Sequence, residues 1–201
     1  MPKVGVAALR KDALIRAAIK EVGQAGSLDV TVSQIADRAG VSSALAHHYF
    51  GSKEQIFLSS MRYILHEFGS SARRRVALAE TPRDRIAAIV AASFEPEQFE
   101  RYVVAAWLAF YVQAQHSKDA ARLLRVYAKR LNSNLVYHLR KLISREAARH
   151  IAQGLAAMID GFYIRCALQE IAPEADEARR LVTDYLDMSL ASALAARREG
   201  R

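Results

Sequence analysis

Residues 31–50 constrain the fold of this chain more than any other stretch, because they carry the signals for two short helices joined by a tight turn. Thr31 and, three residues later, Gln34 form a capping box, which predicts a helix start. This helix is expected to end at Gly40, which supplies the positive φ that a tight turn requires. Ser42 then caps a second helix, expected over 43–50.

The two predicted helices have the spacing of a helix-turn-helix. Val41 is expected to insert between them, and three apolar residues of the first helix are expected to face inward: Ile35, Ala36 and Ala39. In DNA-binding proteins this arrangement places the second helix in the major groove. A plain hairpin of two helices has the same pattern, and the residues considered so far leave that alternative open.

The rest of the chain has the punctuation of longer helices. Helix starts are marked by Ser52, by Thr or Glu followed by Pro at 81–82 and 95–96, by Ser117 and Ser144, and by Pro173 with acidic residues behind it. The helices expected from these signals cover about 10–25, 31–39, 43–50, 53–80, two that start at 82 and 96, 118–142, 145–169 and 173–198.

The chain lacks sustained alternation of apolar and polar residues, so we expect no sheet. The predicted fold is all-α, with about nine helices. Three short helices with tight connections occupy the first 50 residues, and longer helices follow. We therefore expect a helix-turn-helix domain over 1–52 and a larger helical-bundle domain over 53–201.

Basic residues outnumber acidic ones by 29 to 21, which gives a formal charge of +8 with His neutral. Such an excess favours a polyanionic partner, either nucleic acid or an anionic membrane surface. The excess is spread out, with seven basic and four acidic residues in 1–53 and 22 and 17 in 54–201. Charge alone therefore does not locate the binding surface.

Several compartments and chemistries are disfavoured by the composition. A single cysteine, Cys166, excludes an internal disulfide and a thiol zinc site, and we expect it to be a small core residue. The N-terminus lacks the apolar run of a signal peptide. The longest uncharged run, 102–117, has 16 residues and is shorter than the roughly 20 apolar residues of a membrane span. We expect a cytoplasmic protein with no membrane partner.

A helical-bundle enzyme is the competing class. A di-iron carboxylate protein would need two Glu-x-x-His motifs, whereas Glu146 and His150 are four residues apart and solitary. The adjacent pair His47 and His48 would point about 100° apart on a helix, so one ion would not bridge them. Gly-rich phosphate loops are also lacking. We expect no enzyme, no metal and no cofactor.

Residues 39–42 (Ala-Gly-Val-Ser) and 48–54 (His-Tyr-Phe-Gly-Ser-Lys-Glu) resemble the TetR family of transcriptional repressors. The resemblance implies three DNA-binding helices, a fourth helix that leads to a ligand-binding domain, and a homodimer formed through the last two helices. It also implies double-stranded operator DNA as the partner. Because such a dimer has two-fold symmetry, the operator is expected to be palindromic.

The resemblance implies specific DNA contacts. Base edges would be contacted by four residues, Ser43, Ala44, Leu45 and His47. The DNA-binding set also contains Thr31, Ser42, His48, Tyr49 and Lys53, of which Thr31, Tyr49 and Lys53 match positions that hold the phosphate backbone. Thr31 and Lys53 each stand at a helix N-terminus, which attracts phosphate. Ala44, Ala46 and His47 depart from the residues most frequent in the family, and this leaves the operator sequence open.

Four further blocks, 1–5, 106–110, 130–135 and 154–162, resemble the choline-responsive members of this family. Three of these blocks lie in the expected regulatory domain. They imply repression of choline-uptake and glycine-betaine synthesis genes that is relieved by choline. The alternative is a repressor of the same type that responds to another cationic or hydrophobic small molecule.

Choline demands a particular kind of site, because its quaternary ammonium has no N–H and is recognised by aromatic faces, with or without a carboxylate. Two clusters at helical spacing meet this demand, and together they make the predicted ligand-binding set: Trp107, Phe110, Tyr111, Asp160, Phe162 and Tyr163. Aromatic residues at this spacing also pack helical cores, and Asp160 could instead cap a helix or pair with Arg165.

The last two predicted helices carry more apolar residues than one packed face requires. On the first these are Ile151, Leu155, Met158, Ile159 and Phe162, and on the second Leu181, Val182, Tyr185, Leu186 and Leu190. A wide apolar surface on terminal helices favours a two-fold interface of four helices. The alternative is burial of the same residues within one chain.

Overall fold

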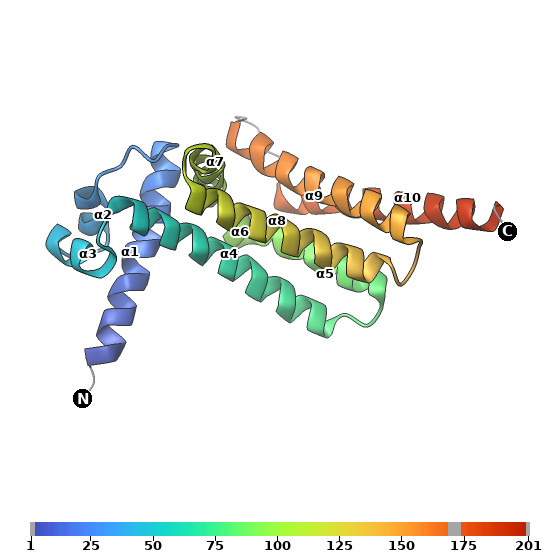
Figure 1. The fold of residues 1–201 in the computed structure, drawn as a ribbon, viewed down its shortest axis with the longest axis horizontal. Helices are drawn as coiled ribbons and strands as arrows, with labels where there is room; N and C mark the ends of the chain where they lie inside the picture. The colour runs from blue at the N-terminus through green and yellow to red at the C-terminus, as the bar shows by residue number, and fades with distance from the viewer. Residues whose placement is uncertain (1–2, 169–173, 200–201) are drawn as a thin grey trace. The chain divides into compact units, whose positions relative to one another are not determined.

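The computed structural model describes residues 3–168 and 174–199, and within them the chain forms ten helices and no strand (Figure 1). The helices are α1 (Lys3–Ala25), α2 (Val32–Arg38), α3 (Ser43–Phe50), α4 (Lys53–Leu78), α5 (Pro82–Ser93), α6 (Pro96–Phe99), α7 (Arg101–His116), α8 (Lys118–Leu139), α9 (Arg145–Leu168) and α10 (Ala175–Glu199). The all-α prediction is confirmed.

Most helix starts lie where side-chain caps predicted them. The hydroxyls of Thr81, Ser117 and Ser144 each accept a backbone N–H from the first turn of the helix that follows, at 3.1–3.3 Å. Ser52 accepts from the N–H of Gln55 in the same way. These contacts span only three residues, which is why they could be predicted locally. The predicted start at Pro173 lies outside the described residues.

Two helix boundaries differ from the prediction. α1 begins at Lys3, seven residues before the expected start at Arg10. The single helix expected from residue 96 is divided into α6 and α7, because the backbone of Glu100 is extended, with φ −60° and ψ 139°. Glu100 makes no side-chain capping bond, so the sequence carried no signal for this break. The division raises the helix number from about nine to ten.

The chain divides by packing into two compact units, which are described separately. Unit 1 comprises residues 1–66 and 100–124, and unit 2 comprises 67–99 and 125–201. Unit 1 therefore adds the start of α4, α7 and the first turns of α8 to the three N-terminal helices. This division differs from the functional division at residue 52, which stays a prediction.

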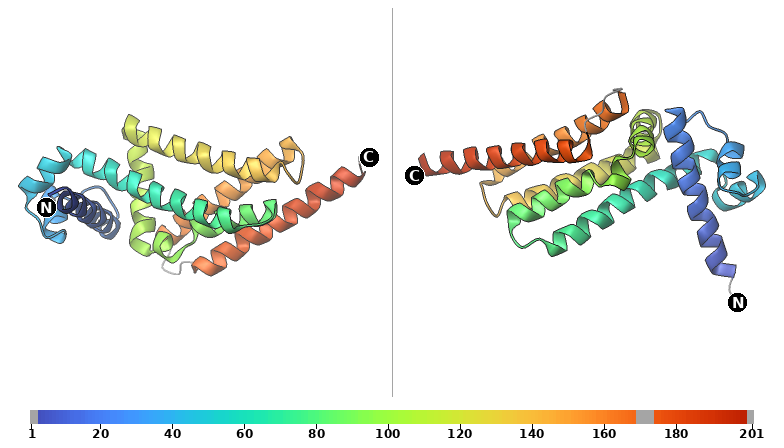
Figure 2. Two further views of the ribbon diagram at one scale, coloured as in Figure 1. Left: turned by 90° about the horizontal axis from the view of Figure 1, so that it is seen from below. Right: turned by 180° about the vertical axis from the view of Figure 1, so that it is seen from behind.

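In unit 1, α1 lies between the α2–α3 pair on one side and α7 on the other (Figures 1 and 2). Its core face carries Leu14 and Val22, which are fully buried. Near the end of α1 the backbone of Tyr102 comes so close to Gly23 that a Cβ there would collide with its carbonyl group. Residue 23 must therefore be glycine, because the contact leaves no room for a side chain.

In unit 2, α10 packs against α9 and α5, and Figure 2 shows α9 and α10 running side by side. The fully buried side chains here include Ile86 of α5, Leu155 of α9 and Leu186 of α10. Cys166 is also buried, as the sequence predicted.

Among the described residues, α9 is the one helix that is long and apolar enough to cross a membrane by length and composition. The same composition is found in core helices of globular proteins. α9 packs against α5 and α10 and its Leu155 and Ile159 are buried, but only 28% of its most apolar window is buried within the chain. Part of its apolar surface stays exposed, at Ile164 and Leu168.

The contact at Gly23 predicts that Gly23→Ala lowers the free energy of unfolding by about 1–3 kcal/mol, because a methyl group would displace α7 from α1. Gly69→Ala is the matched control, since its Cβ would meet only the flexible end of Arg73 at 3.4 Å. That variant is expected to gain up to about 1 kcal/mol from helix propensity. Urea unfolding followed by circular dichroism measures both, and equal stabilities would contradict the packing described here.

Candidate nucleic-acid interface and ligand-binding residues

The turn between α2 and α3 is fixed by short-range hydrogen bonds. Both bonds of the capping box are present: the N–H of Gln34 donates to the Thr31 hydroxyl at 3.2 Å, and the N–H of Thr31 donates to the Gln34 side chain at 2.7 Å. Gly40 has φ +67°, and the N–H of Val41 donates to the carbonyl of Ala36 at 3.0 Å. The predicted capped helix and glycine turn are confirmed.

Helix α3 presents one exposed face. Its cap Ser42 accepts the N–H of Leu45 at 3.2 Å, and Ala46 is fully buried against the unit 1 core. Within α3, three residues of the predicted DNA-binding set are exposed, namely Ala44, His47 and His48, whereas Ser43, Leu45 and Tyr49 are half-buried. Outside α3, Thr31 and Ser42 are exposed and Lys53 is half-buried. A short helix with a buried alanine on one side and exposed polar rings on the other has the form needed to enter a groove.

Several contacts fix side chains at the ends of α3. The hydroxyls of Ser33 and Ser43 lie 3.1 Å apart and join α2 to α3. His47 Nδ1 lies 3.3 Å from the carbonyl oxygen of Gly51, and the rings of His48 and Tyr49 have centroids 5.5 Å apart. These contacts orient the polar rings before any partner is bound, which limits the entropy lost on binding.

The positive charges of unit 1 differ in their surroundings. Arg38 forms an ion pair with Glu21, and its Nη2 donates to Gln24 at 2.6 Å. Lys53 instead begins α4, with its Nζ 5.6 Å from the centroid of the Phe57 ring. Among the described residues no carboxylate forms an ion pair with Lys53, although its charge acts on the neighbouring Glu54 carboxylate and helps to lower the pKa of that group.

Three of the predicted ligand-binding residues belong to unit 1 and share one face of α7. Trp107 and Phe110 are buried and Tyr111 is half-buried. The rings of Trp107 and Tyr111 lie with their centroids 5.8 Å apart and their planes at 31°. The i, i+4 spacing therefore brings two electron-rich rings together, as predicted from the sequence.

The other three belong to α9 in unit 2. Asp160 and Phe162 are half-buried, whereas Tyr163 is buried and its hydroxyl donates to the carbonyl of Ser93 at 2.6 Å. The ring of Tyr163 packs edge-on against Phe99, with centroids 5.5 Å apart. The rings of Phe162 and Phe94 also pack edge-on, with centroids 6.0 Å apart. Phe162 and Tyr163 are thus members of an aromatic cluster that also fills the core around the end of α5.

Two aromatic residues near Asp160 were missed by the sequence analysis. Phe68 of α4 and Tyr127 of α8 pack edge to face, with centroids 5.5 Å apart and planes at 73°. Burial raises the pKa of the Tyr127 hydroxyl, and the negative charge of Asp160 raises it further. Unit 2 therefore holds a carboxylate within electrostatic reach of an aromatic pair. Neither ring has an aromatic neighbour at helical spacing, so no local pattern marked them.

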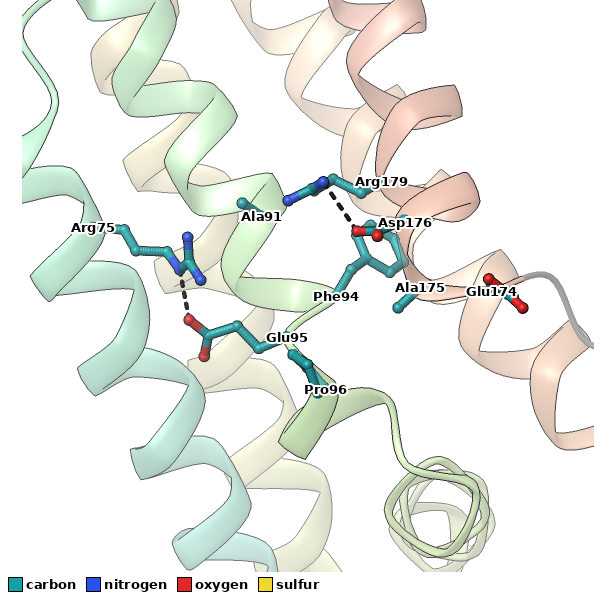
Figure 3. Close-up of a pocket in the computed structure, with 9 residues that line it drawn as sticks. All are labelled: Arg75, Ala91, Phe94, Glu95, Pro96, Glu174, Ala175, Asp176 and Arg179. Carbon is teal, nitrogen blue, oxygen red and sulfur yellow. Dashed lines mark hydrogen bonds and ion pairs between the residues drawn. The ribbon is translucent and has the colours of Figure 1, made fainter.

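Unit 2 also has a surface pocket of about 200 Å³ that contains none of the predicted site residues (Figure 3). Four of its charged side chains form two pairs: Arg75 with Glu95 at 2.5 Å, and Arg179 with Asp176 at 2.9 Å. Burial by itself would raise the pKa of Glu95, but hydrogen bonds from Ser71 and Arg75 outweigh it and hold the pKa below its ordinary value. The Arg75–Glu95 pair joins α4 to the segment between α5 and α6, whereas the Arg179–Asp176 pair lies within α10.

The apolar residues expected at a dimer interface fall into two groups. Most of them, including Leu155, Ile159, Val182 and Leu186, are buried within the chain, so the alternative of internal packing accounts for them. The apolar side chains that stay exposed on α9 and α10 are Ile164, Leu168, Leu181, Met188 and Leu194. Any interface on these helices would therefore use residues other than most of those expected.

Comparison with protein families gives two matches. Residues 14–59 match the family described as bacterial regulatory proteins, tetR family, and residues 82–191 match the BetI-type transcriptional repressor, C-terminal domain. The first range covers the capped helices α2 and α3 with the second half of α1 and the start of α4. The second covers more than half of the chain and includes the helices that carry Trp107 and Asp160.

Similar proteins match over nearly the whole chain. A Brucella anthropi protein named HTH-type transcriptional regulator BetI is 56% identical over 190 residues, which is 94% of this chain and 98% of that protein. A protein of the same name from Agrobacterium fabrum is 48% identical over 96% of this chain and 93% of its own length.

Solved structures share the fold at low identity. A transcriptional regulator from Rhodococcus has a TM-score of 0.80 at 20% identity and covers 91% of this chain and 97% of its own. A putative transcriptional regulator from Saccharomonospora viridis, solved in complex with choline, has a TM-score of 0.78 at 19% identity and covers 88% of this chain and 95% of its own.

Proposed function

The chain belongs to the TetR family of transcriptional regulators, in its BetI-type branch, and from this we propose that it represses choline-uptake and glycine-betaine synthesis genes until choline binds. Members of this family are DNA-binding regulators and not enzymes. The observation that carries the proposal is the match to the BetI-type C-terminal domain over 82–191, because the effector is chosen by that domain and not by the helix-turn-helix.

The exposed face of α3 supports the proposed DNA contacts. Ser43, Ala44, Leu45 and His47 contact base edges, and Thr31, Ser42, His48, Tyr49 and Lys53 form the rest of the DNA surface. Phosphate contacts position a protein on the duplex, whereas base contacts specify the sequence. Thr31 and Lys53 suit the first role because the helix N-termini at which they stand favour an anion.

Choline is recognised through its charge and its methyl groups, which have no hydrogen-bond donor. Asp160 supplies the counter-charge, and the aromatic pair Phe68 and Tyr127 in the same unit supplies ring faces. The proposed ligand-binding set also keeps Trp107, Phe110, Tyr111, Phe162 and Tyr163. The choline complex of the Saccharomonospora viridis regulator supports this ligand class, since that protein shares the fold.

The proposed repressor acts as a homodimer on DNA in the cytoplasm. The exposed apolar residues of α9 and α10, among them Ile164, Leu181 and Met188, form the interface with a second copy. A two-fold dimer presents two α3 helices to a palindromic operator. Choline releases the operator only to the extent that it binds the released conformation more tightly than the DNA-bound one.

The proposal predicts that choline weakens the binding of the purified protein to a fragment from a betaine-synthesis promoter. Fluorescence anisotropy of the labelled fragment measures this, and Trp107 emission monitors choline binding to the protein directly. Sodium chloride at the same concentration is the control, because salt alone weakens protein–DNA complexes. Equal release by the two salts, with unchanged Trp107 emission, would reject choline as the effector.

The two kinds of DNA contact predict different mutant phenotypes. His47→Ala is expected to change the preference among operator sequences by about 1–3 kcal/mol at the affected base pair, because His47 faces base edges. Lys53→Ala is expected to weaken binding to all sequences alike and to reduce the dependence of log K on log salt by about 0.9. The affinity of each variant for a set of single-base operator variants separates the two phenotypes. If His47→Ala and Lys53→Ala showed the same dependence on operator sequence, this docking of α3 would be excluded.

The proposed interface predicts that Met188→Glu yields a folded monomer that has lost tight binding to the palindrome. Met188 is 66% exposed, so the charge disrupts no core packing in the isolated chain. Leu78→Glu is the matched control, because Leu78 is an exposed apolar residue of the same unit on α4. Sedimentation velocity gives the oligomeric state, and a Met188→Glu protein that remains a dimer would place the interface elsewhere.

A further inference from the structure

The first turns of α1 form an exposed helical extension of the helix-turn-helix. In Figure 1 the N-terminal end of α1 continues past α2 and α3, all of which belong to unit 1. Val6 and Leu9 are 49% and 72% exposed, and Arg10 and Lys11 are exposed as well. The part of this segment before Arg10 was not expected to be helical from the sequence, which placed the helix start at Arg10.

Lys11 is the residue at which this extension meets α3. Its Nζ lies 5.5 Å from the centroid of the Tyr49 ring, in the last turn of α3. An ammonium group over an aromatic face is held there by the ring quadrupole. Because Tyr49 is a proposed phosphate contact, the Lys11 ammonium is held beside a surface that approaches DNA.

The charge of Lys11 is not neutralised. Two other cations of unit 1 have carboxylate partners: Arg16 pairs with Asp12 at 2.7 Å, and Arg38 pairs with Glu21. Among the described residues, neither Arg10 nor Lys11 has such a partner. An exposed ammonium without a counter-ion is the group that releases condensed cations when it binds a phosphate.

Lys53, which is half-buried, shares two features with Lys11. It is also a lysine without a carboxylate partner among the described residues, and its Nζ lies over an aromatic ring, that of Phe57. Lys53 belongs to α4 and Lys11 to α1, and they are 42 positions apart in the sequence. Helices α1 and α4 thus each supply one ammonium group held over an aromatic ring.

We infer that Lys11, held by the ring of Tyr49, binds a backbone phosphate of the operator and extends the DNA interface from the helix-turn-helix onto α1. The inference rests on the proposed function, because it adds a contact to the same complex. The partner is the phosphodiester backbone, so the contact adds affinity at every sequence and carries no base preference.

Lys20 provides a matched control on the same helix. It too is exposed, and its Nζ lies 5.7 Å from the centroid of an aromatic ring, that of Tyr102. That ring belongs to α7 and not to the helix-turn-helix. Lys11→Ala and Lys20→Ala therefore remove the same charge and the same kind of ring contact. Both variants are expected to weaken the long-range attraction between protein and DNA equally.

The test measures operator affinity at several salt concentrations for the wild type, Lys11→Ala, Lys11→Arg and Lys20→Ala. One lost phosphate contact is expected to reduce the slope of log K against log salt by about 0.9 and the affinity at 0.1 M salt by roughly five- to tenfold. Lys11→Arg keeps the charge and is expected to keep the wild-type slope. Lys20→Ala is expected to change affinity by less than about twofold, with no change in slope.

Equal effects of Lys11→Ala and Lys20→Ala, or a wild-type slope for Lys11→Ala, would overturn the inference and leave the proposed repressor intact. A wild-type protein that binds the promoter fragment no better than unrelated DNA would instead overturn the proposed function and the inference with it. Thermal unfolding of the variants checks that both alanine proteins fold, and the slope, which loss of folded protein does not alter, keeps the result interpretable.

Discussion

The close packing of α1 against α7 is the contact on which the rest of unit 1 depends. At Gly23 the backbones of the two helices meet with no room for a side chain. α1 in turn carries the α2–α3 pair on its other side, so the position of α3 depends on how α1 is held. The same α7 carries Trp107, Phe110 and Tyr111. A proposed effector contact and the proposed DNA-contacting helix are therefore separated by one tightly packed helix within a single compact unit.

This arrangement gives a physical form to the proposed response. Packed helices shift as rigid elements between discrete arrangements, because close-packed interiors do not deform continuously. A ligand that binds a different position of α7 more tightly would shift α1 as well, since Gly23 leaves no slack between them. The size of the effect on DNA binding is limited by the difference in ligand affinity between the two arrangements.

Local signals predicted the fold where the interactions are local. The capping box at Thr31, the φ of Gly40 and the cap at Ser42 involve residues within four positions, and each is present in the structure. The break at Glu100 lacks a capping bond, so only tertiary packing specifies it. Burial of Leu155 and Leu186 inside the chain likewise depends on α5, α9 and α10 together, and helical periodicity does not distinguish it from an interface.

In the candidate sites, too, the sequence predicted only contacts between residues that are close along the chain. The ring pair Trp107 and Tyr111 was predictable because i and i+4 share a helix face. Phe68 and Tyr127 come from different helices, and only the fold brings them together. The net charge of +8 indicated a polyanionic partner but did not locate the surface that binds it. In the structure Arg16 and Arg38 form ion pairs, whereas Lys11 and Lys53 lie over aromatic rings and are the cations that we propose to bind phosphate.

We propose that operator binding and choline binding are linked through one conformational equilibrium. Linkage requires reciprocity: the factor by which choline weakens operator binding equals the factor by which operator weakens choline binding. Isothermal titration of choline into the free protein and into the saturated protein–operator complex measures the second factor directly. Choline is expected to bind the complex more weakly than the free protein, by the factor seen in the DNA-binding assay. Equal choline affinity in both states would contradict it.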